Sequence, residues 1–389
     1  MEELNIQNFG PIKEARIEFG DLTFLIGPQA SGKSLALELL KLLIDKRHII
    51  YTLENYDYIL SKTDAKNIIE CYFGEGLKGI FREETQISFG KVPFLLKDLL
   101  EMVARKRTSE MQRESVFYIP AQRILSISDG RPKNFMEFDI SAPYVLRRFS
   151  ETLRLFMQGG LGNPDTIFPM RNQLKDVVQD SIHANIFHDA KVIIDKAGGQ
   201  RKMKLEVGDL RIPFMAWSAG QKEFMPLLLA IYCLSGPLTP VVNKADYKWV
   251  IIEEPEMGLH PRAIQAVLLE IIELMQSGYK VVISTHSTTF LEFVWTFNNI
   301  QPLDEETFKS ALCDMFGISR DVYAADLFDS LKQKKIKTYY SAKQRSADGV
   351  TFADISALDA FSDDRAMAEW GGLSSFSSKS SEIVSRYGE

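Results

Sequence analysis

Apolar positions recur at strand-like spacing in the first part of the chain. Residues 4–9 and 15–19 flank the turn Gly10-Pro11, and residues 22–26 form an uninterrupted apolar run. Such runs between turn residues indicate strands, and the uninterrupted one indicates a buried strand. A glycine-containing loop follows, and then a helical pattern over residues 34–45. We therefore expect three strands, a loop and a helix at the start of the fold.

A second regular pattern begins at Trp249. Apolar runs at 249–252 and 280–284 alternate with helical patterns at 262–275 and 288–298. The order strand, helix, strand, helix is typical of a parallel sheet covered by helices. The sequence therefore predicts an α/β fold with a mixed or parallel sheet.

These patterns divide the chain into a core and three additions. We expect the core to comprise residues 1–45, 115–125 and 190–300. Residues 46–114 read as an insertion of helices with a β-hairpin at 80–89, and residues 126–189 as a helical insertion. Residues 301–389 read as a small C-terminal α/β extension.

Composition narrows the class of protein. The formal net charge is -6, so strong binding to nucleic acid would need a local basic patch. Three widely spaced cysteines favour a reducing compartment over a disulfide framework. The N-terminus lacks the pattern of a signal peptide, and the longest apolar run, near residues 224–234, is too short to span a bilayer. We expect a cytoplasmic protein without a membrane partner.

Residues 27–34 read GPQASGKS and match the phosphate-loop pattern G-x-x-x-x-G-K-[ST]. The predicted strand before it and the predicted helix after it are the context that this motif requires. Glycines let the backbone N–H groups surround a phosphate, the lysine reaches the β- and γ-phosphates, and the serine binds Mg²⁺. The predicted cofactors are ATP and Mg²⁺. The predicted nucleotide-binding residues are Gly27, Gln29, Ala30, Ser31, Gly32, Lys33 and Ser34.

Two acidic residues end the apolar run 249–252. A buried strand delivers such carboxylates to the edge of the sheet where a phosphate loop also lies. We expect Glu253 to hold Mg²⁺ together with Ser34, and Glu254 to polarise the attacking water. Glu253 stands where an aspartate is usual, and the longer side chain can still reach the ion.

The segment Ser218-Ala219-Gly220-Gln221 resembles the LSGGQ signature of ABC ATPases. In that family the signature serine and helix start contact the γ-phosphate bound to a partner subunit, as unpaired N–H groups and a helix dipole allow. The alternative is purely structural, because Ser218 and Gln221 also fit a helix capping box.

Three further features follow from the same resemblance. His286, after the run 280–284, corresponds to the switch histidine that contacts the γ-phosphate. Gln122, after Pro120, corresponds to the Q-loop residue that senses Mg²⁺ and the attacking water. Residues 255–261 occupy the D-loop position, where His260 replaces the usual aspartate. The predicted catalytic residues are thus Glu254, His286 and Gln122, with Ser34, Glu253 and Gln122 near the metal.

The order of the motifs and the segments 253–261 (EEPEMGLHP) and 118–123 (YIPAQR) resemble those of the RecF/SMC/OLD-like branch of ABC-type ATPases. This resemblance implies a P-loop ABC-ATPase head that forms a homodimer or higher oligomer around ATP. Members of the branch include ATPases of anti-phage systems that work with a separate nuclease or toxin. The tail lacks the Asp-x-Asp setting of the Toprim nuclease found in OLD proteins. The alternatives are a RecF-like DNA-repair or DNA-maintenance ATPase and a scaffold that binds nucleotide without hydrolysis.

Overall fold

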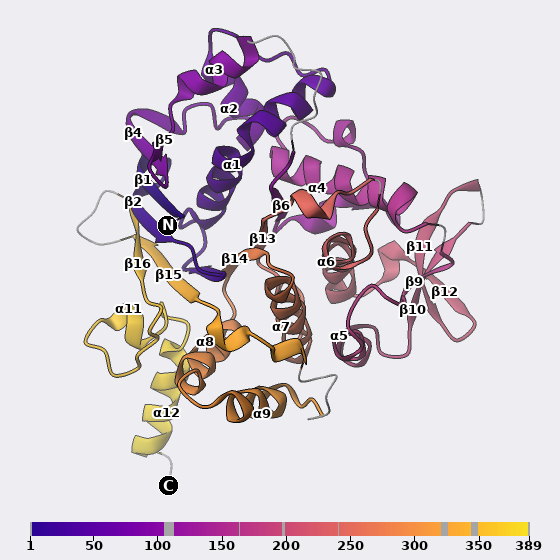
Figure 1. Ribbon diagram of the computed structural model, residues 1–389, viewed down its shortest axis with the longest axis vertical. Helices are drawn as coiled ribbons and strands as arrows, with labels where there is room; N and C mark the ends of the chain where they lie inside the picture. The colour runs from indigo at the N-terminus through magenta and orange to yellow at the C-terminus, as the bar shows by residue number, and fades with distance from the viewer. Residues whose placement is uncertain are drawn as a thin grey trace. The chain divides into compact units, whose positions relative to one another are not determined.

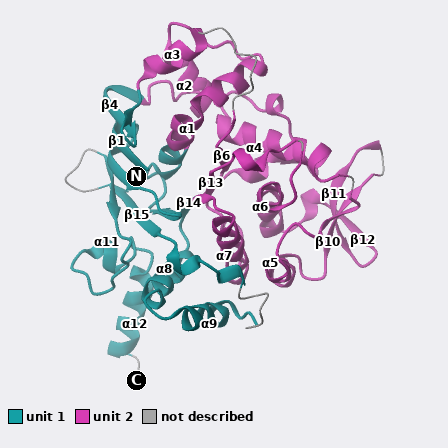
Figure 2. Ribbon diagram, in the orientation of Figure 1, with its two compact units in different colours: residues 1–37, 81–94, 282–389 teal, residues 38–80, 95–281 magenta. Residues whose placement is uncertain are grey.

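A computed structural model describes residues 2–104, 113–162, 164–196, 199–239, 241–319, 326–343 and 349–387. The chain forms two compact units, shown in teal and magenta in Figure 2. Unit 1 comprises residues 1–37, 81–94 and 282–389, and unit 2 comprises residues 38–80 and 95–281. Helix α1 (Lys33–Asn55) begins in unit 1 and continues in unit 2, and strand β14 (Lys280–Thr285) runs from unit 2 into unit 1.

Unit 1 is built on a mixed sheet. The strand order is β5-β4-β1-β2-β16-β15-β3-β14. Its other strands are β1 (Glu3–Phe9), β2 (Ile12–Glu18), β3 (Leu22–Ile26), β4 (Phe81–Phe89), β5 (Val92–Pro93), β15 (Ile336–Lys343) and β16 (Val350–Asp354). Its helices are α8 (Thr288–Ile300), α9 (Glu305–Phe316), α11 (Arg365–Ala368) and α12 (Ser375–Tyr387), labelled in Figure 1.

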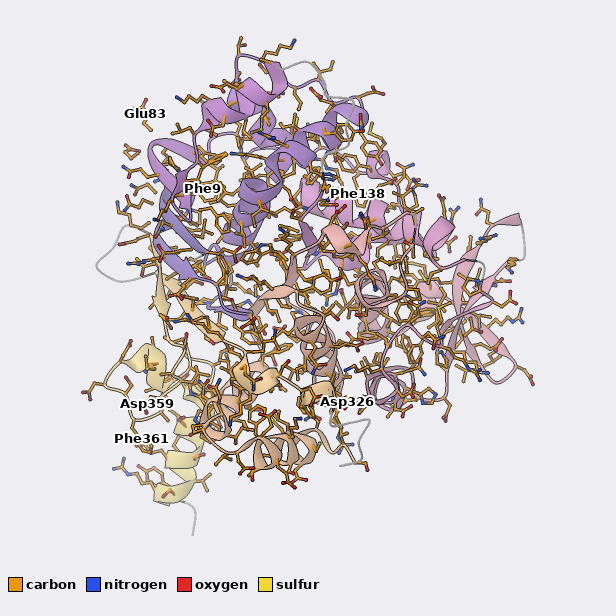
Figure 3. The ribbon with its side chains drawn as sticks, in the orientation of Figure 1. Phe9, Glu83, Phe138, Asp326, Asp359 and Phe361 are labelled. Atoms are coloured by element: carbon orange, nitrogen blue, oxygen red, sulfur yellow. The ribbon has the colours of Figure 1, made fainter. Side chains whose placement is uncertain are left out.

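The last part of the chain contributes strands inside this sheet. β15 pairs in parallel with β3, with Ile336 opposite Leu22, and in antiparallel with β16. β16 in turn pairs in parallel with β2. β1 pairs in antiparallel with β2 and with β4 and buries Phe9, which is labelled in Figure 3. The predicted C-terminal α/β extension therefore completes the sheet that begins at the N-terminus.

Unit 2 combines helices with short strands. β6 (Val116–Ile119) and β13 (Trp249–Glu253) pair in parallel. β9 (Thr166–Phe168), β10 (Lys191–Asp195), β11 (Lys202–Val207) and β12 (Leu210–Pro213) form a separate antiparallel sheet, visible in Figure 1. β7 (Ile127–Ser128) and β8 (Arg131–Pro132) form a small hairpin. The helices are α2 (Ala65–Phe73), α3 (Leu96–Ala104), α4 (Tyr144–Leu155), α5 (Asp176–Ile182), α6 (Ala219–Ser235) and α7 (Pro261–Gln276).

The α/β class and the mixed sheet predicted from the sequence are confirmed. The strands expected at 4–9, 22–26, 249–252 and 280–284 correspond to β1, β3, β13 and β14, and the helices at 262–275 and 288–298 to α7 and α8. Within the described residues, no helix has both the length and the apolar character needed to cross a membrane. The division into core and insertions stays a prediction, and residues 105–112 within the segment 46–114 lie outside the described residues.

Two predicted elements were wrong in detail. The helix expected to end at Asp45 continues to Asn55, with a kink at Asp45 (φ -107°, ψ 18°). The Asp45 carboxylate accepts N–H groups of Ser115 and Val116 at 2.9 and 3.0 Å, which ties the kink to β6. The hairpin expected within 80–89 is a single strand, β4, whose hairpin partner is β5.

Candidate functional site

The phosphate loop connects β3 to α1 in unit 1 and has an unusual backbone conformation. Gly27, Ala30 and Gly32 have positive φ angles of 144°, 57° and 78°. A Cβ on Gly27 would lie 2.1 Å from the carbonyl oxygen of Ser341, so only glycine fits there. Gly27 is therefore required by the packing of this fold as well as by the motif.

Lys33 lies inside the loop. Its side chain is buried, and Nζ donates hydrogen bonds to the carbonyl oxygens of Gly27 and Pro28, both at 2.8 Å. Gln29, Ala30 and Ser34 are exposed around it. Lys33 opens helix α1, so a cation and the N-terminal end of a long helix coincide, as an anion site requires.

Ser341 on β15 supports the loop, and motif matching alone did not find it. Its hydroxyl lies 2.7 Å from the Ser31 hydroxyl and donates to the carbonyl oxygen of Ile26 at 3.1 Å. The Ser31 hydroxyl also donates to Pro28 O at 2.7 Å. The Ser341 side chain on β15 thus holds the phosphate loop in place. The spacing of motifs in the sequence could not reveal this contact because Ser341 lies far from the loop along the chain.

A cavity of about 590 Å³ adjoins the loop within unit 1. It is lined by the loop itself, by the turn between β1 and β2, and by the cations Arg82 and Lys343. This volume is in the range of small-ligand sites, and the cations suit an anionic ligand.

His286 also belongs to unit 1. It follows the end of β14 and is half-buried, and the next residue, Ser287, caps helix α8 by accepting the N–H of Thr289 at 3.2 Å. The phosphate loop and the predicted switch histidine are thus parts of the same compact unit.

The predicted metal-binding carboxylate, Glu253, ends β13 in unit 2 and is buried. Its Oε2 accepts the N–H of Ala121 at 3.1 Å. Burial raises the pKa of Glu38 well above its ordinary value, and the charge of Glu253 adds to this effect. Burial likewise raises the pKa of Tyr118, again with a contribution from Glu253.

Glu254 has a left-handed backbone, with φ of 42°. Non-glycine residues in this region carry strain, which concentrates at functional sites. The Glu254 carbonyl oxygen accepts hydrogen bonds from Arg123 Nη1 and Nη2 at 3.2 and 3.1 Å, while its side chain is half-exposed. The strained peptide is therefore held by a neighbouring cation.

Arg123 is a site residue that sequence reasoning treated only as a neighbour of Gln122. Its side chain is 0% exposed, and besides Glu254 O it donates to the carbonyl oxygens of Glu223 and Glu253, both at 3.0 Å. Burial lowers the pKa of Arg123. Gln122 is exposed, directly before the short 3-10 helix that contains Arg123. Arg123 therefore connects the Gln122 turn, the end of β13 and the start of α6.

The signature segment forms the start of α6 in unit 2. Ser218 Oγ accepts the N–H of Gln221, and Gln221 Oε1 accepts the N–H of Ser218, both at 3.3 Å. The capping box that the sequence left open is thus present. Ser218 and Ala219 remain exposed. A Cβ on Gly220 would lie 2.7 Å from the carbonyl oxygen of Gly258, so the helix start packs tightly against the D-loop segment.

His260, at the predicted D-loop position, has a structural role. It is the N-cap of α7, and its Nδ1 accepts the N–H of Arg262 at 3.3 Å. Pro261 follows at the first helical position, which suits the fixed φ of proline.

The predicted metal ligands are a serine hydroxyl, a glutamine amide oxygen and a carboxylate. Mg²⁺ prefers such oxygen donors and is usually held by one or two carboxylates together with substrate phosphates. Ser34 and Gln122 are exposed, while Glu253 is buried. The chemistry of this donor set fits Mg²⁺ bound with a nucleotide.

A family model described as an AAA domain, with the AbiEii toxin of type IV TA systems in the same description, matches residues 22–292. The chain belongs to this family. All predicted site residues of this AAA-family protein, from Gly27 to His286, lie within the matched range. The match extends from β3 to α8, so it includes parts of both compact units.

The AAA-family chain is also similar to the Old nuclease of Escherichia phage P2. The two are 46% identical over 59 residues, which are 15% of this chain and 10% of the nuclease. The match thus spans about a tenth of the Old nuclease. Together with the family, it confirms the resemblance to the RecF/SMC/OLD-like branch.

Two solved structures are similar over most of the chain. The SMC head domain from Thermotoga maritima has a TM-score of 0.36 at 11% identity, covering 91% of this chain and 98% of the other. An SMC head bound to the C-winged helix domain of ScpA has a TM-score of 0.39 at 11% identity, covering 94% and 98%.

Proposed function

We propose that this AAA-family protein binds and hydrolyses ATP, dimerises around it, and thereby controls a separate effector protein in anti-phage defence. The observation that carries the proposal is the start of α6, where Ser218 and Ala219 are exposed beside a glycine packed on the D-loop segment. A capping box accounts for one N–H of this helix start. The other N–H groups of the first turn suit an anion presented by a partner.

Within one copy, the loop N–H groups and Lys33 bind the phosphates. Ser34 and Glu253 hold Mg²⁺, with Gln122 beside them, and Mg²⁺ when bound neutralises charge on the β- and γ-phosphates. Glu254 polarises the water that attacks the γ-phosphorus, and His286 donates to the γ-phosphate. The phosphate loop and His286 belong to unit 1, and the carboxylates belong to unit 2, so the proposal requires both units to act on one nucleotide.

ATP closes the dimer because only ATP offers a γ-phosphate to both copies. A ligand shifts an equilibrium only by its differential contacts with the two states. ATP contacts the signature helix of the partner in the closed dimer and not in the separate copies. Hydrolysis removes that contact and releases the dimer.

The effector and the defence role rest on the comparisons. The family description names a toxin of a toxin–antitoxin system, and the similar phage protein is a nuclease. We assign the toxic activity to a separate effector protein and the ATP-dependent control to this chain, acting in the cytoplasm.

Replacing Ser218 with arginine tests the proposal. The Ser218 side chain is exposed, so the substitution removes the helix cap, at a cost of about 1 kcal/mol, but meets no buried neighbour. The bulk of the arginine side chain blocks contact between the helix start and a γ-phosphate. We expect ATP binding to one copy to be unchanged, while steady-state ATP hydrolysis falls by about 100-fold, the scale of losing a charge-stabilising contact. Binding is measured with a fluorescent ATP analogue and turnover by phosphate release.

The matched control is Ser277→Arg, the same substitution at an exposed serine after α7. It should retain wild-type turnover. Equal turnover in Ser218→Arg and wild-type protein would contradict the shared site, and wild-type protein without any ATP hydrolysis would contradict the proposed enzyme.

A further inference from the structure

Unit 2 contains a cavity of about 750 Å³ that no predicted motif lines. Its walls come from the β7–β8 hairpin, from the π-helical turn after α4 (Phe156–Gly160), and from β10 with the segment that leads to β11. This volume lies within the range of small-molecule sites. The volume alone does not identify a ligand, so the class of ligand has to be inferred from the side chains that line the cavity.

The lining is strongly basic. It contains the cations Arg131, Lys133, Arg154 and Arg201 and one carboxylate, Glu137, which gives a local formal charge of +3. The whole chain carries -6, so this local sign opposes the global one. A positive cavity in a negative protein favours an anion that the rest of the surface repels.

Two of the cations are available for a ligand. Within the described part of the chain, the side chains of Arg131 and Arg201 form no ion pair or hydrogen bond, and both are exposed. Lys133 forms a cation–π contact, with its Nζ 5.0 Å from the ring centroid of Phe138, which is labelled in Figure 3. Guanidinium groups bind phosphate in a bidentate manner, which makes arginine the preferred partner of that anion.

The walls are held in place by their own contacts. Ser150 on α4 donates to the carbonyl oxygens of Ser126 and Lys133 at 3.0 and 2.8 Å, which ties the hairpin to the helix. Gly130 at the hairpin tip accepts the N–H of Met203 on β11 at 2.9 Å. The cavity is therefore present before a ligand arrives, and ligand binding need not order its walls.

Arg154 holds Gln158, another residue of the cavity wall, in place. Its Nε and Nη2 donate to Glu151 at 2.9 and 2.6 Å, and its Nη1 donates to Gln158 at 2.8 Å. Glu151 neutralises much of this charge, so Arg154 positions Gln158 and contributes less to anion binding than Arg131 and Arg201.

The remaining lining is apolar or carries amides. Met157, Leu161 and Ile194 offer apolar surface, and Asn134 and Gln200 offer amide groups. We propose that this cavity binds a phosphorylated nucleoside, with its phosphate on Arg131 and Arg201 and its ring against the apolar wall. A free nucleotide and the 5′-end of a nucleic-acid strand share this chemistry.

The test is a calorimetric titration of full-length protein with 5′-phosphorylated dithymidine, which lacks the triphosphate that a phosphate loop requires. Wild-type protein and the Lys33→Ala variant should bind it equally. The Arg131→Glu/Arg201→Glu double variant should bind at least about 30-fold more weakly, the effect of losing a charge-assisted phosphate contact. Lys62→Glu/Lys78→Glu, an equal charge change at exposed lysines of unit 2, should bind like wild type.

A 5′-phosphorylated 12-mer distinguishes the two sources. Equal affinities for dinucleotide and 12-mer support a site for free nucleotides, and binding of the 12-mer alone supports a site for strand ends. The proposal is overturned if neither probe binds at millimolar concentration. It is also overturned if the Arg131→Glu/Arg201→Glu variant binds like wild type, with circular dichroism showing that both proteins are folded.

Discussion

At the scale of single residues, the fully buried guanidinium of Arg123 donates hydrogen bonds to four backbone carbonyl oxygens. Those of Glu253, Glu254 and Pro255 lie at and just after the end of β13, and that of Glu223 belongs to α6. Burial makes the charged form costly, and several charge-assisted hydrogen bonds offset this cost. We propose that Arg123 acts on ATP hydrolysis through the peptide of Glu254, which makes it a positioning residue.

We predict that Arg123→Met lowers the free energy of unfolding by about 3 kcal/mol, since it leaves buried carbonyl groups without donors. Turnover per folded molecule also falls, because the strained Glu254 peptide loses its support. Arg123→Lys recovers part of the stability, since an ammonium cannot reproduce the forked geometry. Urea unfolding and phosphate release measure the two effects.

The control for this prediction is Arg171→Met, which removes an exposed arginine of the same unit. It should unfold like wild type. An Arg123→Met protein with wild-type stability and turnover would show that the buried guanidinium has no positioning role.

The sequence identified those site residues that belong to a continuous sequence motif. Gly27 and Lys33 were found because the phosphate loop is continuous in sequence, and the structure gives both a distinct geometric role. Ser341 and Arg123 were missed because their contacts join residues more than a hundred positions apart. The capping box of Ser218 and Gln221 was predicted as an alternative and is present, whereas its contact with nucleotide stays a prediction.

At the scale of elements, helix α7 contains a buried acidic side chain, that of Glu270. Glu270 is buried, and within the described residues neither of its carboxylate oxygens has a hydrogen-bond partner. Burial raises the pKa of Glu270 well above its ordinary value, and Glu273 one turn later adds to the effect. Between the ordinary pKa and the raised one, the folded protein therefore holds a proton on Glu270 that the unfolded chain has released.

This raised pKa predicts the sign of a pH dependence. Below the ordinary pKa both states are protonated and the group has no effect. As pH rises from the ordinary pKa to the raised one, the unfolded state loses its proton first, and the free energy of unfolding falls by about 1.4 kcal/mol per pH unit. Glu270→Gln removes this slope and raises stability at neutral and alkaline pH.

Urea unfolding of Glu270→Gln and wild type from pH 5 to pH 9 measures the difference. Glu292→Gln, on an exposed position of α8, is the control and should leave the pH profile unchanged. Parallel profiles for Glu270→Gln and wild type would refute the shifted pKa.

The elements themselves were predicted best where a hydrophobic run was bounded by turn residues. β3 and β13 were found within a residue of their ends because both are continuous apolar runs. The kink at Asp45 was taken for a helix end, since the sequence cannot show that the Asp45 side chain binds backbone N–H groups of residues 115 and 116. β16 was missed because its strand pattern is half-exposed and one of its two partners, β2, lies at the other end of the chain.

At the scale of the whole molecule, the chain combines a family match over residues 22–292 with a tail that completes the sheet of unit 1. β15 runs parallel to β3, and its residue Ser341 contacts Ser31 of the phosphate loop. The loop therefore contacts a strand, β15, that lies far from it in the sequence. Glu253, predicted to bind Mg²⁺, and Glu254, predicted to be catalytic, belong to unit 2.

The central claim is that ATP joins two copies through the phosphate loop of one and the signature helix of the other. The most direct measurement is the mass of the Glu254→Gln protein by light scattering with and without ATP and Mg²⁺. Blocked hydrolysis should trap the closed state, so we predict a doubling of mass with ATP that ADP does not produce and that Ser218→Arg abolishes. An unchanged mass in saturating ATP would contradict the claim and leave the signature segment as a capped helix only.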